Sequence, residues 1–403
     1  MRIKRTIINF IMSNERVRAL CLSILLVSGM ALVTYSINGV IPYPDQKYSS
    51  WDHYKYIAMA QQPFSSNQLV HQAPFCWRIL TPWLVHFLPM DFSVSFYLIT
   101  FLALCFSGYV FYFCMRALKL SSIISSLGVV LFMLVYTVTS FNMWDFYLTD
   151  PIGLMFVGIS FYFLIVGKDW LLALVMAVGI ANKETILIMV PVFFVYLLCR
   201  RRYSLFRSVL RTLVVMTPCL IIFLVIRLLI KPFNDYGLGQ ITLTLTNYKS
   251  QGIFYALYSF SFGTWGIILS LFLLKPREKF SLLIKRVDLL VLVLLIYATL
   301  LIGNDAGRML VYAYPVLIPI ATLSLLDFSK KTGVRFVYCS AGCILLQILC
   351  LMSNFDLGDG VFKHLRVVAL FICIAAWFWA EWQLSRANKT DLASSTLSVL
   401  TGH

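Results

Sequence analysis

Long apolar runs, separated by short polar segments, dominate the hydrophobic pattern of the chain. Twelve runs approach or reach the length of about 20 residues that a helix needs to cross a bilayer. Two neighbouring runs, 169–182 and 185–199, are short, so they either cross a thinned bilayer or form a re-entrant pair. The pattern predicts an all-α polytopic membrane protein with about 12 transmembrane helices. The predicted spans are 19–40, 92–115, 121–141, 151–167, 169–182, 185–199, 212–230, 253–274, 287–303, 309–326, 336–353 and 364–384.

Shorter helical patterns lie between the first two runs. The stretch "WDHYKYIAMA" (51–60) predicts a short helix rich in amphipathic aromatic residues. The stretch "WRILTPWLVHFLPM" (77–90) is apolar but too short to cross, which is typical of a helix lying at the interface. We expect a single integral membrane domain, residues 1–403, in which 41–91 is the first outer loop with interfacial helices. The polar end of the chain, 385–403, is predicted to be a disordered cytoplasmic tail.

The composition excludes a soluble protein. Hydrophobic residues make up 60% of the 403 residues, charged residues only 12%, and the mean hydropathy is +0.85. A soluble domain typically has about 25% charged residues. The net charge of +16 comes from short basic clusters between apolar runs, which argues against a nucleic-acid partner. The ten cysteines lie mostly in apolar runs and show no zinc-ligand spacing, so we predict neither a disulfide framework nor structural zinc.

The distribution of basic residues predicts the orientation. The sequence begins with the basic segment "MRIKRTIINFIMSNERVRAL", and no small-x-small cleavage pattern follows the first apolar run. We therefore expect this run to be an uncleaved anchor. With the N-terminus inside, 23 of the 33 Lys and Arg residues fall on the cytoplasmic side. This bias follows the positive-inside rule, and the even number of spans places both termini in the cytoplasm.

Charged residues also gather at the outer ends of the predicted spans. Such groups are costly near a bilayer, and they indicate a functional site by default. Carboxylates can supply a general base, and Arg and Lys can bind a phosphate. Together with the aromatic residues of 51–56, they suit an amphipathic substrate with a lipid tail, a phosphate and a sugar. The charged residues are Asp52, Arg78, Asp145, Asp150, Lys183, Glu184, Asp305 and Arg308.

Each of these charged residues also has a purely structural interpretation. Asp52 and Asp150 stand where a helix is expected to start, and a carboxylate there is favoured by about 0.3–1 kcal/mol. Asp305 and Arg308 are three residues apart and can simply form a pair. A polar turn or a snorkelling side chain explains the others. The recurrence of such residues at separate outer turns is what favours a shared site.

Three of these segments resemble the polytopic glycosyltransferases of the GT-C fold. The first is "WDHYKYIAMA", with an acidic residue early in the first outer loop. The second is "PFCWRILTPWL", which is similar to a "PF-x-x-R-x-L-x-P" stretch of bacterial members. The third is the second outer loop, with its acidic residues Asp145 and Asp150. The sequence departs from the family pattern because its first loop has no Asp-Glu or Asp-x-Asp pair and no large soluble C-terminal domain follows.

The resemblance implies an inverting glycosyltransferase in the bacterial inner (plasma) membrane, with a GT-C-like fold. Its donor would be a polyprenyl-phosphate-linked sugar, its acceptor a lipid or glycan, and its reaction would occur on the outer face. No cofactor is implied, because a monophosphate donor does not demand a metal. No metal site is predicted, although the scattered carboxylates leave a divalent metal open. The oligomeric state is left open.

The resemblance also assigns roles to individual residues. Asp52 would be the catalytic base. The donor phosphate would be bound by Arg78, Lys183 and Arg308. Substrate contacts would come from Tyr54, Tyr56 and Asp305, and the candidate second acidic residues are Asp145, Asp150 and Glu184.

Two other functions fit a polytopic membrane protein with outer charges. A transporter or flippase of a lipid-linked or polar substrate usually carries ionisable residues near the bilayer midplane, on broken helices. Here Arg227 and Asp288 lie towards span ends, which argues against a transporter. The two short runs on either side of "ANKET" could still form a re-entrant element, which would favour one. An O-antigen-type polymerase or ligase also acts on lipid-linked sugars outside. It uses a large late outer loop, whereas the late outer loops here, 304–308 and 354–363, are short.

Overall fold

The apolar runs form helices because a backbone in lipid must satisfy its hydrogen bonds internally. A computed structural model describes residues 14–41, 51–63, 65, 70–233, 242, 246, 252, 261–301, 305–355 and 361–387. In these residues every regular element is helical. The predicted tail, 385–403, lies almost wholly outside the described residues, as does the first part, 253–260, of the predicted span 253–274.

In the described part of the chain, five helices are long and apolar enough to cross a membrane: α2 (Glu15–Asn38), α5 (Phe92–Ala117), α11 (Leu205–Leu229), α18 (Tyr314–Thr332, with the turns just before it) and α20 (Val361–Ala387). The protein is therefore a helical membrane protein, as the sequence predicts. The number of crossings stays a prediction, because the other apolar helices are shorter. These are α6 (Ser122–Met133), α8 (Asp150–Val166), α9 (Asp169–Gly179), α10 (Met189–Cys199), α16 (Val287–Ala298) and α19 (Phe336–Met352).

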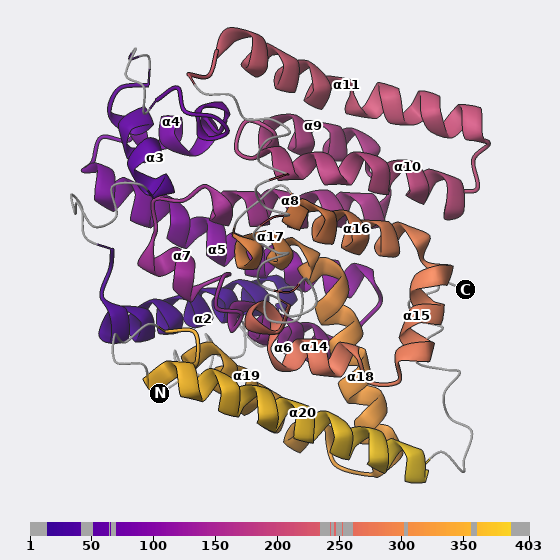
Figure 1. The fold of residues 1–403 in the computed structure, drawn as a ribbon. Coiled ribbons are helices and arrows are strands. Elements are labelled where there is room, and N and C mark those ends of the chain that lie inside the picture. The colour runs from indigo at the N-terminus through magenta and orange to yellow at the C-terminus, as the bar shows by residue number, and fades with distance from the viewer. Residues whose placement is uncertain are drawn as a thin grey trace, which may run out of the picture.

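The remaining elements are short. They are α3 (Asp52–Gln61), η2 (Phe75–Trp77), α4 (Leu80–His86), α7 (Ser140–Trp144), η3 (Glu184–Ile188), α14 (Ile267–Phe272), α15 (Pro276–Lys285), η4 (Thr299–Leu301), α17 (Ala306–Leu310) and η5 (Val311–Ala313). The predicted short helices of the first outer loop correspond to α3 and α4, which pack together. Both lie at one end of the helices, whereas α15 lies at the other end (Figure 1).

The predicted span 121–141 is interrupted in the structure. Helix α6 ends at Met133, and the chain turns before α7 begins at Ser140. The Asn142 amide donates to the carbonyl oxygens of Thr137 and Val138 at 2.9 and 2.8 Å. This side chain satisfies backbone groups that the broken helix leaves free, a need that the apolar pattern alone does not reveal.

Helix α18 forms the centre of the protein, and α11 lies on its outside. In the apolar stretch Gly307–Thr332, 89% of the window is buried, whereas the figure is 22% for α11 and for α20. Helix α11 runs along one edge of the molecule, over α9 and α10, and α20 runs along the opposite edge (Figure 1). The outward side chains of α11 and α20 therefore face the lipid.

Two glycines of α8 allow the tyrosines that precede and begin α18 to approach closely. A Cβ atom at Gly153 would lie 2.5 Å from the Tyr312 hydroxyl, and one at Gly158 would collide with the Tyr314 hydroxyl. Tyr314 donates to the Leu154 carbonyl oxygen at 3.1 Å. This packing holds the start of α18 against α8. Asp150 is the first residue of α8, and Arg308 lies in α17, shortly before α18.

Candidate functional site

Hydrogen bonds join three of the segments that carry the predicted site residues. The backbone N–H of Leu80 donates to the Ala181 carbonyl oxygen at 2.9 Å. The Thr81 hydroxyl donates to the Asn182 side-chain oxygen at 2.5 Å, and the Asn182 amide donates to the Thr149 carbonyl oxygen at 2.8 Å. The start of α4, the turn between α9 and η3, and the start of α8 therefore form one platform.

Asp150 and Arg308 form the buried centre of a charge network on this platform. The side chain of Asp150 is 3% exposed. One of its carboxylate oxygens accepts from Arg308 Nε at 3.0 Å and Nη2 at 2.6 Å, and the other is paired with Lys183. The Tyr312 hydroxyl adds a contact at 3.4 Å. Asp150 thus anchors two cations, which a mere helix-start residue would not do.

Asp52 lies at the open edge of this network. Its carboxylate accepts from Arg308 Nη1 at 2.9 Å, across 256 positions of sequence, and lies 3.8 Å from Lys55 Nζ. It is the first residue of α3, directly after the N-cap residue Trp51, and its carboxylate pairs with Arg308. Its side chain is 27% exposed, in contrast to the buried Asp150. Asp305 caps α17 and shares the same Arg308 nitrogen at 3.3 Å.

Arg78 forms a second ion pair beside the first. Its Nε and Nη2 donate to the two Glu184 oxygens at 3.0 and 2.5 Å, and its Nη1 donates to the Tyr56 hydroxyl at 3.0 Å. Tyr56 is fully buried, and this burial raises the pKa of its phenol to about 12. The hydroxyl therefore stays protonated and also accepts from Thr149 at 3.3 Å. Tyr56 holds Arg78 in place and does not line the surface.

The charges balance across the network. Burial raises the pKa of Asp52, but the nearby cations, Arg308 first, lower it more, so the net pKa lies below its ordinary value of 3.8. Asp52 is therefore ionised at neutral pH. Four cations face four carboxylates: Lys55, Arg78, Lys183 and Arg308 against Asp52, Asp150, Glu184 and Asp305.

Two predicted site residues lie to one side of the network. Asp145 is buried next to His53, with 3.4 Å between its Oδ2 and the ring Nδ1. Burial raises the pKa of Asp145. The Tyr54 ring lies against the same His53, with 4.7 Å between the ring centroids. Both residues belong to the wall behind Asp52, and no described hydrogen bond joins Asp145 to the ion pairs above.

Sequence reasoning missed Lys55, Tyr312 and Asn182. Lys55 is one helical turn from Asp52, and Tyr312 is one turn from Arg308, so helical spacing could have indicated both. Asn182 adjoins Lys183 in sequence, but its bridging role depends on contacts with distant segments. Within the described residues, no group of three or more His, Cys, Asp or Glu side chains is placed to hold a metal ion.

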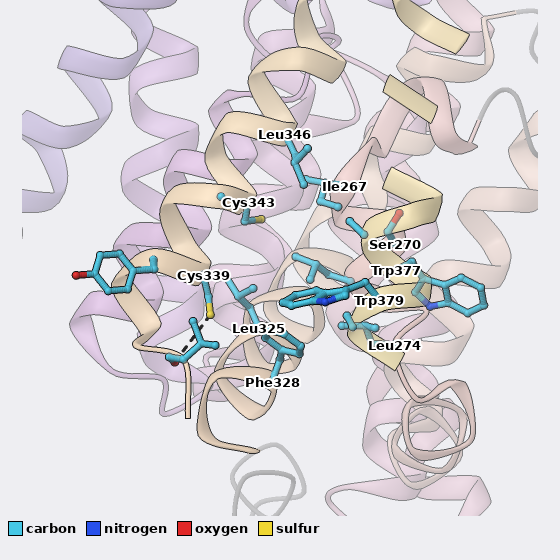
Figure 2. A pocket seen from close by; sticks show the side chains of 16 residues that line it. Ile267, Ser270, Leu274, Leu325, Phe328, Cys339, Cys343, Leu346, Trp377 and Trp379 are labelled. Atoms are coloured by element: carbon cyan, nitrogen blue, oxygen red, sulfur yellow. Dashed lines mark hydrogen bonds between the residues drawn. The ribbon is translucent and has the colours of Figure 1, made fainter. Parts of the chain in front are cut away.

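An apolar cavity of about 250 Å³ lies elsewhere, between α14, α18, α19 and α20 (Figure 2). None of its 16 lining side chains carries a charge. It therefore contributes nothing to the ionic site at the start of α8. Comparison with known proteins gives no assignment: no family model matches the sequence, and no curated protein matches it.

Proposed function

We propose that this chain is an inverting membrane glycosyltransferase of the GT-C type. It transfers a sugar from a polyprenyl-phosphate-linked donor to a lipid or glycan acceptor on the outer face of the bacterial inner membrane. One observation carries the proposal: Asp52 is a partly exposed, ionised carboxylate, held by Arg308 at the edge of a buried ionic network. An ionised carboxylate that a substrate can reach can accept a proton from an acceptor hydroxyl.

The reaction is a single displacement. The acceptor oxygen attacks the anomeric carbon while the bond from that carbon to the phosphate oxygen breaks. The acceptor proton passes to Asp52, and the phosphate leaves on the lipid as polyprenyl phosphate. Because the pKa of Asp52 is low, it is a weak base in the ground state. Proton transfer is therefore late, after bond formation has made the acceptor hydroxyl acidic.

The cations would stabilise the charge that develops on the leaving phosphate. Arg308 fixes the position of Asp52, and Arg78 presents its guanidinium beside Tyr56. Lys183 is buried against Asp150 and acts through its positive field. Such fixed charges stabilise a transition state well because they need no reorganisation during the reaction. Asp305 and Tyr54, at the edge of this region, are the proposed sugar or acceptor contacts.

The arrangement of the helices supports the proposed orientation. Helix α3, which begins at Asp52, and α15, with its basic residues, lie at opposite ends of the structure (Figure 1). The basic segments Arg200–Arg202 and Lys330–Arg335 border helices whose other ends approach the site. An inside location for α15 then places Asp52 outside, with twelve crossings in the proposed topology.

Transport fits the described helices less well. The central parts of α5, α8 and α18 carry no charged residue. Transporters usually bind their substrates near the bilayer midplane, at ionisable or unwound positions. Here the charges of these helices lie at their ends, which favours chemistry at the membrane surface.

The pH dependence of transfer should depend on Lys55. Burial alone raises the pKa of Asp52, and Lys55 is among the cations that lower it. In Lys55→Met, one lowering charge is lost, so the pKa of Asp52 rises. The acid limb of kcat/KM, measured between about pH 4 and pH 8, should move to higher pH. Lys285→Met, on the exposed face of α15, is the control. An acid limb that stays in place in Lys55→Met would separate Asp52 from the proton transfer.

The function itself is tested by mass spectrometry of lipid-linked sugars and surface glycans from cells with and without the gene. We expect one polyprenyl-phosphate-linked sugar to accumulate and one sugar to disappear from a surface lipid or glycan. Unchanged pools of both would overturn the proposal.

A further inference from the structure

Arg227 is a cation close to the site that is not part of the balanced network. It lies in the last turn of α11, two residues before its last residue. Its guanidinium carbon lies 3.2 Å from the centroid of the Trp77 ring and 4.8 Å from that of Phe223. Among the described residues, no carboxylate pairs with it within 4 Å. Its guanidinium thus lies close to two aromatic rings, and no hydrogen bond from its N–H groups to another described residue is seen.

The Trp77 platform is itself fixed. Trp77 is nearly buried, and its indole N–H donates to the Ile230 carbonyl oxygen at 3.1 Å. This bond joins η2 to the end of α11. A simple snorkelling arginine would extend freely into water, whereas Arg227 is stacked on a held ring. Its position is therefore defined by the protein.

Arg227 lies between the lipid and the ionic network. On one side, its charge is close enough to act on Glu184 and Arg78. Arg78 in turn is close enough to act on Asp52. On the other side, the neighbouring α11 side chains Leu228 and Leu229 are 74% and 77% exposed on the lipid-facing surface. The order from lipid to base is thus Arg227, Arg78, Asp52.

The charges identify the ligand class. Each of the four cations of the network already faces a carboxylate, whereas Arg227 has no carboxylate within 4 Å among the described residues. Arg227 adds one positive charge, which matches the single negative charge of a phosphodiester. Arginine also presents its donors in a planar fork that fits phosphate oxygens. The exposed leucines indicate that the phosphate belongs to a molecule with a hydrocarbon tail.

We propose that Arg227, stacked on Trp77, binds the phosphate of the lipid carrier where it enters from the bilayer. The tail lies along the outer face of α11, the phosphate lies between Arg227 and Arg78, and the head group points towards Asp52. The identity of this ligand as the sugar carrier rests on the proposed function. Binding of a lipid phosphate at Arg227 does not require that the chain transfer a sugar.

The test is binding of a synthetic polyprenyl phosphate to the purified full-length chain in lipid nanodiscs, measured by native mass spectrometry. Arg227→Gln should weaken binding by about 10- to 100-fold, as expected for losing a charged hydrogen-bond pair. Arg227→Lys keeps the charge but loses the fork, so it should weaken binding to an intermediate extent. If the glutamine variant does not fold, the lysine variant still allows the binding to be tested.

Two controls separate this site from general effects. Arg207 lies on the same helix with its guanidinium carbon 5.7 Å from the Tyr203 ring centroid, and Arg207→Gln should bind as wild type does. The matching polyprenol, which has no phosphate, should bind more weakly to wild type. Equal binding of the alcohol, equal competition by inorganic phosphate, or unchanged binding by Arg227→Gln would each overturn the proposal. The assay needs no turnover, so its result is independent of whether the chain is a transferase.

Discussion

Asp52→Asn is expected to lower the rate of sugar transfer by about 10²–10⁴-fold, with the protein level in the membrane close to normal. The substitution keeps the shape of the side chain and removes the proton acceptor. Asparagine at a helix start is tolerated nearly as well as aspartate, so α3 should still form. Transfer activity and membrane abundance are to be measured on the same preparations.

Asp91→Asn is the matched control for a helix-start role. Asp91 caps α5, where its carboxylate accepts from the backbone N–H groups of Ser93 and Val94 at 2.8 and 3.4 Å. It is exposed and does not touch the ion pairs of the site. Its asparagine variant should keep full activity. If Asp52→Asn also transfers sugar at the wild-type rate, Asp52 is a structural residue and the base must be sought at Asp145 or Asp150.

Asp150→Asn is expected to destabilise the protein by about 3–5 kcal/mol, because it leaves two buried cations without their common counter-charge. Lys183 and Arg308 both pair with this carboxylate, whose side chain is 3% exposed. The free energy of unfolding in detergent gives the measurement. Activity should fall as well, since Arg308 would lose the partner that fixes it beside Asp52.

Glu15→Gln provides the comparison for a more exposed pair. Glu15 Oε1 lies 2.6 Å from Arg116 Nε, and both side chains are 36% exposed. We expect a loss of at most about 1 kcal/mol there. A second substitution, Lys183→Met, should restore part of the stability lost in Asp150→Asn, because it removes one uncompensated charge. A small loss in Asp150→Asn, or no rescue by Lys183→Met, would show that the network is not held by this charge pairing.

The sequence could predict that these charged residues share a site, but not how they pair. Charge counts predict that Asp52, Asp150, Lys183 and Arg308 lie on one side of the membrane, a side that stays a prediction, and the structure brings all four together. Arg308 bonds Asp150 and Asp52, which are 158 and 256 positions away. Composition and periodicity contain no information on contacts at such separations. The expected local pair between Arg308 and Asp305 is present, but it is only one of the three ion pairs that Arg308 forms.

Burial was the other property that the sequence did not determine. Tyr54 and Tyr56 look equivalent in "DHYKY", yet Tyr56 is fully buried against Arg78 and Tyr54 is partly exposed. Their difference follows from the two faces of α3, one of which packs on α4. Arg227 looked like an ordinary residue near a span end. Its stacking on Trp77 depends on how α11 meets η2, which only the tertiary structure shows.

The most direct test of the central claim is product analysis with the purified chain in lipid nanodiscs. Lipid-linked sugars extracted from membranes lacking the gene serve as donors, and mass spectrometry measures the polyprenyl phosphate released. We predict that the wild-type chain releases one polyprenyl phosphate for each sugar transferred, with inverted anomeric configuration, and that Asp52→Asn releases almost none. Donors that remain intact with the wild-type chain, although bound or moved across the bilayer, would contradict the account.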